Sequence, residues 1–223
     1  MPQRKGKKLI IYFFLLLTLA SINNIKFPNI GFDYINKINV SGLDNINNLI
    51  ILKQLENLNL KNIFFLNKKE IQNIINSNTL VETYYVIRKY PDTIDIKILK
   101  TKFLAKINKN RETFLVGSNG RLSKINSSQY DLPYIFGKPK INEFLNFKKT
   151  IDQSKILYSD IEKIYFFQSK RWDIKLKNSV LIKLSKNYTI DSLEEVFQFL
   201  NDINFKDVKI IDARIKNQII IND

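Results

Sequence analysis

The residue types that most often carry out enzyme chemistry are scarce in this chain. Its 223 residues include no cysteine and no histidine, which excludes thiol nucleophiles, ordinary zinc clusters and the commonest general acid or base at neutral pH. No serine has a histidine partner, and no Ser-x-x-Lys motif is present. Glycine motifs that bind phosphates or dinucleotides are absent too. We therefore expect no enzyme activity, no cofactor and no metal.

The carboxylates offer no better catalytic arrangement. Glu194 and Glu195 are adjacent on an expected helix, so their side chains point to different faces. Asp92 and Asp95 lie beside a turn, where aspartate is common for structural reasons. Paired-carboxylate chemistry is not predicted.

The N-terminus has the pattern of a membrane anchor. A basic tail, residues 1–8, precedes an uncharged and mostly apolar stretch, residues 9–25. As a helix this stretch reaches roughly 26 Å, near the lower limit for a bilayer span. The basic flank favours a cytoplasmic N-terminus, with the rest of the chain on the other side. A cleaved signal peptide ending near Ala20 is the alternative, but the apolar run continues past that site.

The formal net charge of +15 raises the question of an anionic partner. The best candidates for nucleic-acid contacts are Tyr84, Tyr85 and Tyr90 beside Arg88 and Lys89. The chain is also rich in Lys, Asn, Ile, Phe and Tyr, the residues of A/T-rich codons, so mutational drift is an alternative source of the charge. The expected location outside the cytoplasm argues against nucleic acid.

A hairpin is expected within residues 79–105. Two β-prone runs flank the turn at 90–93, and Ile94, Ile96 and Ile98 alternate with polar residues. A strand at 35–40 comes earlier. A helix capped near 45–48 follows, with Leu49, Leu52 and Leu55 on one stripe. A second helix is capped at Asn67 and has Ile71, Ile74 and Ile75 inward. Residues 35–100 thus predict a β-α-α-β-β module of the α+β class.

A second, β-rich region is expected from residue 101 to 223. We predict a mainly antiparallel sheet with two helices. One helix covers 142–155 with Phe144, Phe147 and Ile151 inward, and the other begins with a capping box at Asp191–Glu194. Residues 131–137 are expected to form a loop. The expected strands are 103–107, 113–116, 161–167, 172–176, 180–184, 208–215 and 218–221.

The last strand is the best candidate for a binding element. A strand at the end of a chain is often an edge strand, with a row of unpaired backbone N–H and C=O groups. Such an edge can accept a strand from another protein. The alternative is that this strand only closes the sheet.

The order of these parts resembles the FtsQ/DivIB family of cell-division proteins. The resemblance covers essentially the whole chain. It rests on short motifs in order, behind the anchor: 38–42, 62–66, 86–94, 114–116 with Gly120, 132–133 with Gly137, 171–176 and 211–214. The family often has a glutamate after the second hairpin strand, where Lys100 or Thr101 stands in this chain.

The resemblance implies a POTRA domain at 35–100 and an FtsQ-type domain at 101–223. It implies a non-enzymatic divisome scaffold, a single-pass protein of the bacterial inner membrane at the septum. Its C-terminal strands would bind FtsB, itself paired with FtsL, at Ile215, Lys216, Asn217 and Gln218, and its POTRA domain would serve recruitment by proteins such as FtsK. The alternative is another POTRA-containing envelope protein, in polypeptide transport or outer-membrane assembly.

Overall fold

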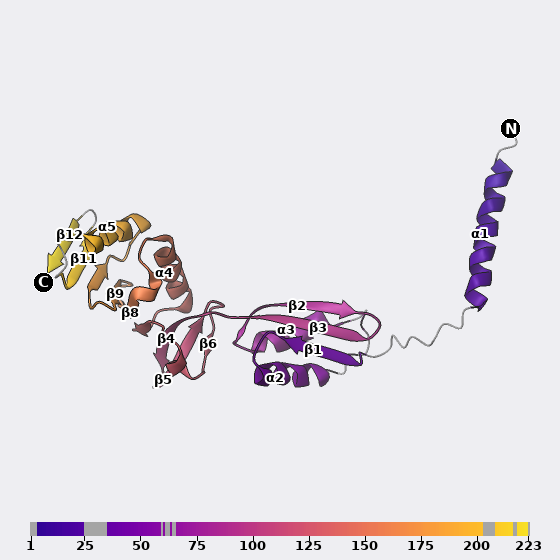
Figure 1. Cartoon of the computed structure of the whole chain (residues 1–223), viewed down its shortest axis with the longest axis horizontal. Helices are drawn as coiled ribbons and strands as arrows, with labels where there is room; N and C mark the ends of the chain where they lie inside the picture. The colour runs from indigo at the N-terminus through magenta and orange to yellow at the C-terminus, as the bar shows by residue number, and fades with distance from the viewer. Residues whose placement is uncertain are drawn as a thin grey trace.

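The computed structural model describes residues 4–24, 35–58, 60, 63, 66–202, 208–215 and 218–222 (Figure 1). Helix α1 (Arg4–Asn24) contains the apolar stretch expected at 9–25, except Ile25, which lies outside the described residues. The apolar side chains from Leu9 to Leu19 are exposed, for example Leu9 at 72% and Phe14 at 66%. Within the described ranges, no helix combines the length and the apolar character needed to cross a membrane. The predicted membrane span is therefore not confirmed and stays a prediction.

The first module has the predicted order of elements. It contains β1 (Lys37–Ser41), α2 (Asn45–Glu56), α3 (Lys68–Ser77), β2 (Val81–Lys89) and β3 (Thr93–Lys100). The sheet order is β1-β3-β2, with β1 parallel and β2 antiparallel to the central strand. The β-α-α-β-β prediction is confirmed.

The alternation of apolar and polar residues along β3 explains how the sheet of this module packs against its two helices. Ile94, Ile96 and Ile98 are at most 4% exposed and form one core with buried residues of both helices, so α2 and α3 cover the same face of the sheet. Asp44 caps α2 by accepting a hydrogen bond from the Asn47 backbone N–H at 3.0 Å. Asn67 caps α3 in the same way, with Glu70 as donor.

The buried stripe predicted for α2 is partly wrong. The buried residues are Ile51 and Leu55, whereas Leu49 is 53% exposed. Leu49 precedes Ile51 by two positions, which turns it about 200° around the helix axis, away from the sheet. Apolar residues lie on both sides of α2, with Ile46, Leu49 and Ile50 exposed, so the spacing of the leucines alone does not identify the buried side.

The second module is built on one nine-stranded sheet. Its order is β12-β11-β10-β9-β8-β7-β4-β5-β6, antiparallel except at the β4–β7, β7–β8 and β10–β11 pairs. Helices α4 (Ile141–Gln153) and α5 (Ile190–Asn201) accompany it, with short 3-10 turns at Ser127–Gln129 and Tyr158–Asp160. The strands are β4 (Phe103–Lys109), β5 (Glu112–Gly117), β6 (Leu122–Ser123), β7 (Tyr134–Phe136), β8 (Ile161–Phe166), β9 (Trp172–Leu176), β10 (Leu181–Leu184), β11 (Ile210–Ile215) and β12 (Gln218–Asn222).

A row of isoleucines in register covers the face of this sheet that packs against the core. Each lies opposite the next on the neighbouring strand: Ile107, Ile135, Ile164, Ile174, Ile182 and Ile211. The predicted inward residues of α4, Phe144, Phe147 and Ile151, are fully buried against this core. Leu193 and Val196 of α5 join the same cluster.

Two local predictions in this module are wrong. The expected loop at 131–137 contains β7, which lies between β4 and β8 and is parallel to both. The strand has three residues and lies between Pro133 and Gly137. So short a segment is extended because it pairs with a strand on each side. Helix α5 begins at Ile190 rather than after Asp191, because Thr189 and Ser192 form the capping box.

The position of β7 makes Ile135 a core residue, at 2% exposed. Replacing it by alanine leaves a cavity, so we expect Ile135→Ala to lower the free energy of unfolding by about 2–5 kcal/mol. The measurement is urea denaturation of the purified chain. Lys138→Ala, at an exposed position just beyond the strand, should change it by less than about 0.5 kcal/mol. Equal effects of the two substitutions would contradict the central placement of β7.

Candidate partner-binding edge and the junction between the modules

Strand β12 is the end strand of the large sheet. Within the described part of the chain it pairs with β11 alone, so its other side carries unpaired backbone groups. The prediction that the last strand lies at a sheet edge is confirmed. Ile220 on this strand is 41% exposed, so both backbone and apolar side-chain surface are accessible there.

Two of the four predicted contact residues are described, and the structure brings them together. Ile215, at the end of β11, lies opposite Gln218, at the start of β12. Both are exposed, Ile215 at 54%. Lys216 and Asn217 lie outside the described residues. Contact of these four residues with a partner stays a prediction.

An ion pair stiffens β11 just before Ile215. The register of the β11–β12 pair shifts between Asp212 and Ile215, and Asp212 accepts hydrogen bonds from the Arg214 backbone N–H at 3.1 Å and from its Nε at 2.8 Å. The Arg214 hydrogen bonds hold the pKa of Asp212 below its ordinary value. The sequence prediction missed this pair, although opposite charges two residues apart on a strand share one face.

A surface pocket of about 580 Å³ lies beside this end of the edge. The first two turns of α5 contribute Asp191 and Glu195 to its lining, and the β11–β12 hairpin contributes Arg214, Ile215 and Gln218. A partner strand that adds to β12 would therefore pass a hollow with both charge signs on its walls.

Charges continue from Asp212 into the sheet on the face opposite the isoleucine row. Asp173 on β9, Lys183 on β10 and Asp212 on β11 are neighbours in register. Burial raises the pKa of Asp173, which is 3% exposed, although the Arg171 guanidinium opposes the shift. This alternating ladder fixes the side chains beneath the edge hairpin.

The two modules are joined by only Thr101 and Lys102, and the short connection is held by side chains. The Glu82 carboxylate, at the start of β2, accepts hydrogen bonds from the Thr101 hydroxyl at 2.8 Å and the Ser118 hydroxyl at 2.7 Å. The Thr101 backbone N–H donates to the Leu80 carbonyl at 2.8 Å. Glu82 thus supplies a carboxylate at the connection between the two modules.

The turn after β5 completes this junction. Asn119 Nδ2 donates to the Thr79 and Val81 carbonyls, both at 2.9 Å, and Arg121 Nη1 donates to the Asn76 carbonyl at 2.6 Å at the end of α3. A Cβ on Gly117 would lie 2.6 Å from Asn119 Oδ1. A side chain at this position would therefore push against Asn119 and Thr101, two residues of the junction.

Among the described residues no group of three or more His, Cys, Asp or Glu side chains is placed to hold a metal ion. The groups that the edge at β12 offers for binding are unpaired backbone N–H and C=O groups, exposed apolar side chains and charged side chains.

The junction predicts a specific loss of stability. Asn119→Ala removes two hydrogen bonds that cross between the modules, so we expect the free energy of unfolding to fall by about 1–3 kcal/mol. Hydrogen exchange at residues 79–81 should accelerate in parallel. Asn142→Ala, exposed on α4, is the matched control. Unchanged exchange in the Asn119 variant would contradict the role of this turn.

The Asp212–Arg214 pair predicts a pH dependence. Because the pKa of Asp212 is lowered on folding, its contribution to stability is complete above its ordinary value of 3.8 and is lost as pH falls further. We expect the melting temperature to drop less between pH 7 and pH 3 in Asp212→Asn than in the parent chain, because the variant has lost this contribution already at pH 7. Thermal scans at both pH values measure this, and parallel drops would exclude the pair as a source of acid sensitivity.

Comparison with known proteins places this geometry in a family. Residues 34–100 match the model of the POTRA domain, FtsQ-type, and residues 105–214 match that of the cell division protein FtsQ/DivIB, C-terminal. The cell division protein FtsQ of Rickettsia bellii is 29% identical over 207 residues, covering 85% of this chain and 72% of the relative. FtsQ of Rickettsia conorii is 26% identical over 196 residues, with the same two shares.

A solved structure is also similar, the major extracytoplasmic domain of DivIB from Geobacillus stearothermophilus. It has 13% identity and a TM-score of 0.33, covering 46% of this chain and 89% of that chain. The two family models together account for most of the chain and for both modules in order. The expected resemblance is confirmed: the chain belongs to the FtsQ/DivIB family of cell-division proteins, which is a scaffold family and not a known family of enzymes.

Proposed function

We propose that this chain is a non-enzymatic scaffold of the divisome that binds a later-acting partner by strand addition at β12. The observation that supports this most is the unpaired edge at the end of a nine-stranded sheet, in a chain of the FtsQ/DivIB family. An added strand would extend the sheet through backbone hydrogen bonds, which give affinity without demanding a particular sequence.

Side chains around the edge would supply the specificity. Ile215, Lys216, Asn217 and Gln218 are the proposed contacts, and the pocket beside Ile215 and Gln218 would receive a partner side chain. The proposed partner is FtsB in complex with FtsL. Both are expected from the family resemblance.

The rest of the chain would place this edge at the septum. We propose a cytoplasmic basic tail at 1–8, a single-pass inner-membrane anchor at 9–25, and a POTRA domain at 35–100. The domain at 101–223 would lie in the periplasm with it. Four cations before Leu9 and an uncharged stretch after it support this orientation. The POTRA domain would contact earlier components such as FtsK, so the chain would link early and late division proteins.

Site-specific photocrosslinking tests the edge. A photoreactive residue at Gln218 should capture a small coiled-coil protein in dividing cells, because an added strand passes directly over it. The same residue at Lys109, exposed at the end of β4, is the control and should capture none. Efficient capture at Lys109 with none at Gln218 would move the interface away from β12.

Depletion of the protein in its native bacterium tests the cellular role. A divisome scaffold predicts filaments without septa, and a fluorescently tagged copy should concentrate at midcell and restore division. Normal division after depletion, or a tag spread evenly around the envelope, would contradict the proposal.

A further inference from the structure

The sequence contains a single Asn-Gly pair, Asn119–Gly120, and this pair lies in the turn that joins the two modules. Asparagine loses its side-chain amide most readily before glycine, because glycine has no Cβ to hinder attack of its backbone nitrogen on the preceding side chain. Gly120 has a φ of 73°, a conformation that glycine adopts without strain. The shape of the turn therefore favours a glycine directly after Asn119.

Deamidation at this pair takes place within the chain and consumes only water. The Gly120 backbone nitrogen attacks Cγ of Asn119, so a new C–N bond forms while the bond from Cγ to Nδ2 breaks. The departing amino group takes up the proton that the Gly120 nitrogen loses and leaves as ammonia. Water then opens the cyclic imide at either carbonyl, which leaves aspartate or isoaspartate at position 119.

The intact junction holds the groups that would have to react. The Gly120 N–H donates to the Gly117 carbonyl at 3.0 Å, which keeps the proton on the attacking nitrogen. Asn119 Nδ2 donates to two carbonyls of the first module, both at 2.9 Å, and its Oδ1 accepts from the Arg121 N–H at 3.0 Å. Loss of ammonia would break both bonds to the first module, so the closed junction opposes the reaction.

Neither product can restore the junction. A carboxylate has no N–H to donate, so both carbonyls of the first module would face an acceptor. The new charge would also lie near Glu82, because the Thr101 hydroxyl donates to Glu82 at 2.8 Å and accepts from the Asn119 backbone N–H at 3.3 Å. Isoaspartate adds a backbone atom to the turn, which disturbs the hydrogen bond from the Gly117 N–H to the Arg121 carbonyl.

We propose that Asn119 is a deamidation site that is protected while the two modules are held together and that reacts when the junction opens. The rate in the folded protein is then the rate in the open state multiplied by the fraction of molecules that are open. Because the reaction removes the hydrogen bonds that close the junction, a transient separation of the modules becomes permanent.

The consequence is a single, irreversible change in the scaffold. The connection through Thr101 and Lys102 would remain, but without the side-chain bonds that fix it. Strands β2 and β12 would then no longer be held in a fixed relation. This inference rests on the junction and not on a partner at β12, so it goes beyond the proposed function.

The first test compares native and unfolded samples of the full-length chain purified in detergent. Both are incubated at the same mildly alkaline pH and temperature, one of them in concentrated urea. Peptide mass spectrometry measures aspartate and isoaspartate at position 119, and we expect their formation to be about tenfold or more faster in urea. Asn142, exposed on α4 and followed by glutamate, is an internal control that should react slowly in both samples.

A variant that opens the junction without changing the Asn-Gly pair is the second test. Glu82→Ala removes the acceptor of the Thr101 and Ser118 hydroxyls, so we expect the native variant to deamidate about tenfold faster than the parent chain. Glu56→Ala, at the exposed end of α2, should change the rate by less than about twofold. Circular dichroism of both variants separates opening of the junction from global unfolding.

Asn119→Asp reproduces one of the two products. Hydrogen exchange at residues 79–81 should accelerate in this variant, whereas Asn142→Asp should leave it unchanged. Equal rates in native and urea-treated parent chain, no acceleration in folded Glu82→Ala, or unchanged exchange in Asn119→Asp would each overturn the proposal. Failure of crosslinking at Gln218 would alter none of these measurements, so the proposed function and this inference are tested separately.

Discussion

The constraint on which the architecture depends is the two-residue connection between the sheets. Strand β3 ends at Lys100 and β4 begins at Phe103, so the modules cannot separate far, and their relative orientation is set by what surrounds Thr101. The Glu82 carboxylate accepts hydrogen bonds from two hydroxyl groups there. Asn119 and Arg121 donate hydrogen bonds to backbone carbonyls of the first module. Hydrogen bonds to charged groups are stronger than neutral ones. These hydrogen bonds therefore make the junction rigid, so it does not act as a flexible linker.

A rigid junction holds the two edge strands of the chain, β2 and β12, in a fixed relation to each other. Strand β2 lies at the end of the small sheet and β12 at the end of the large one. The edges differ in chemistry: β2 borders a hollow whose lining includes Lys68 and Arg88, whereas β12 borders a pocket of mixed charge beside the Asp212–Arg214 pair. Two strands added to these edges would be held in fixed relation by one molecule, which is what a scaffold requires.

Much of the fold follows from local patterns in the sequence. Alternation of Ile94, Ile96 and Ile98 predicted β3 correctly because the period of two reports which face is buried. Helix α4 was equally readable from Phe144, Phe147 and Ile151. The exposure of Leu49 and the strand β7 were not predicted correctly. Apolar residues lie on both sides of α2, so their spacing does not show which side is buried, and β7 is extended because β4 and β8 flank it.

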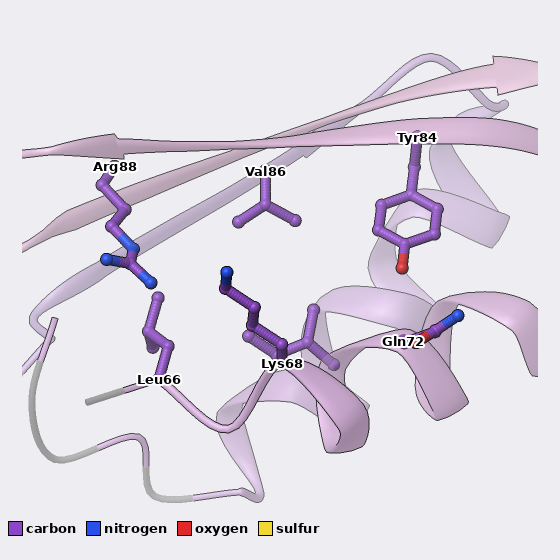
Figure 2. Close-up of a pocket in the computed structure, with 7 residues that line it drawn as sticks. Leu66, Lys68, Gln72, Tyr84, Val86 and Arg88 are labelled. Atoms are coloured by element: carbon purple, nitrogen blue, oxygen red, sulfur yellow. The ribbon is translucent and has the colours of Figure 1, made fainter. Parts of the chain in front are cut away.

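The sequence by itself determined the order of most elements and the family, and it made the last strand a candidate edge. These depend on short-range periodicity, caps and motif order, all of which are local in the chain. The tertiary structure alone decided the junction and the hollow between α3 and β2. Asn119 meets Thr79 across 40 positions, and Lys68 lies across the hollow between α3 and β2 from Arg88 (Figure 2). Such contacts arise from chain closure, which no local pattern records.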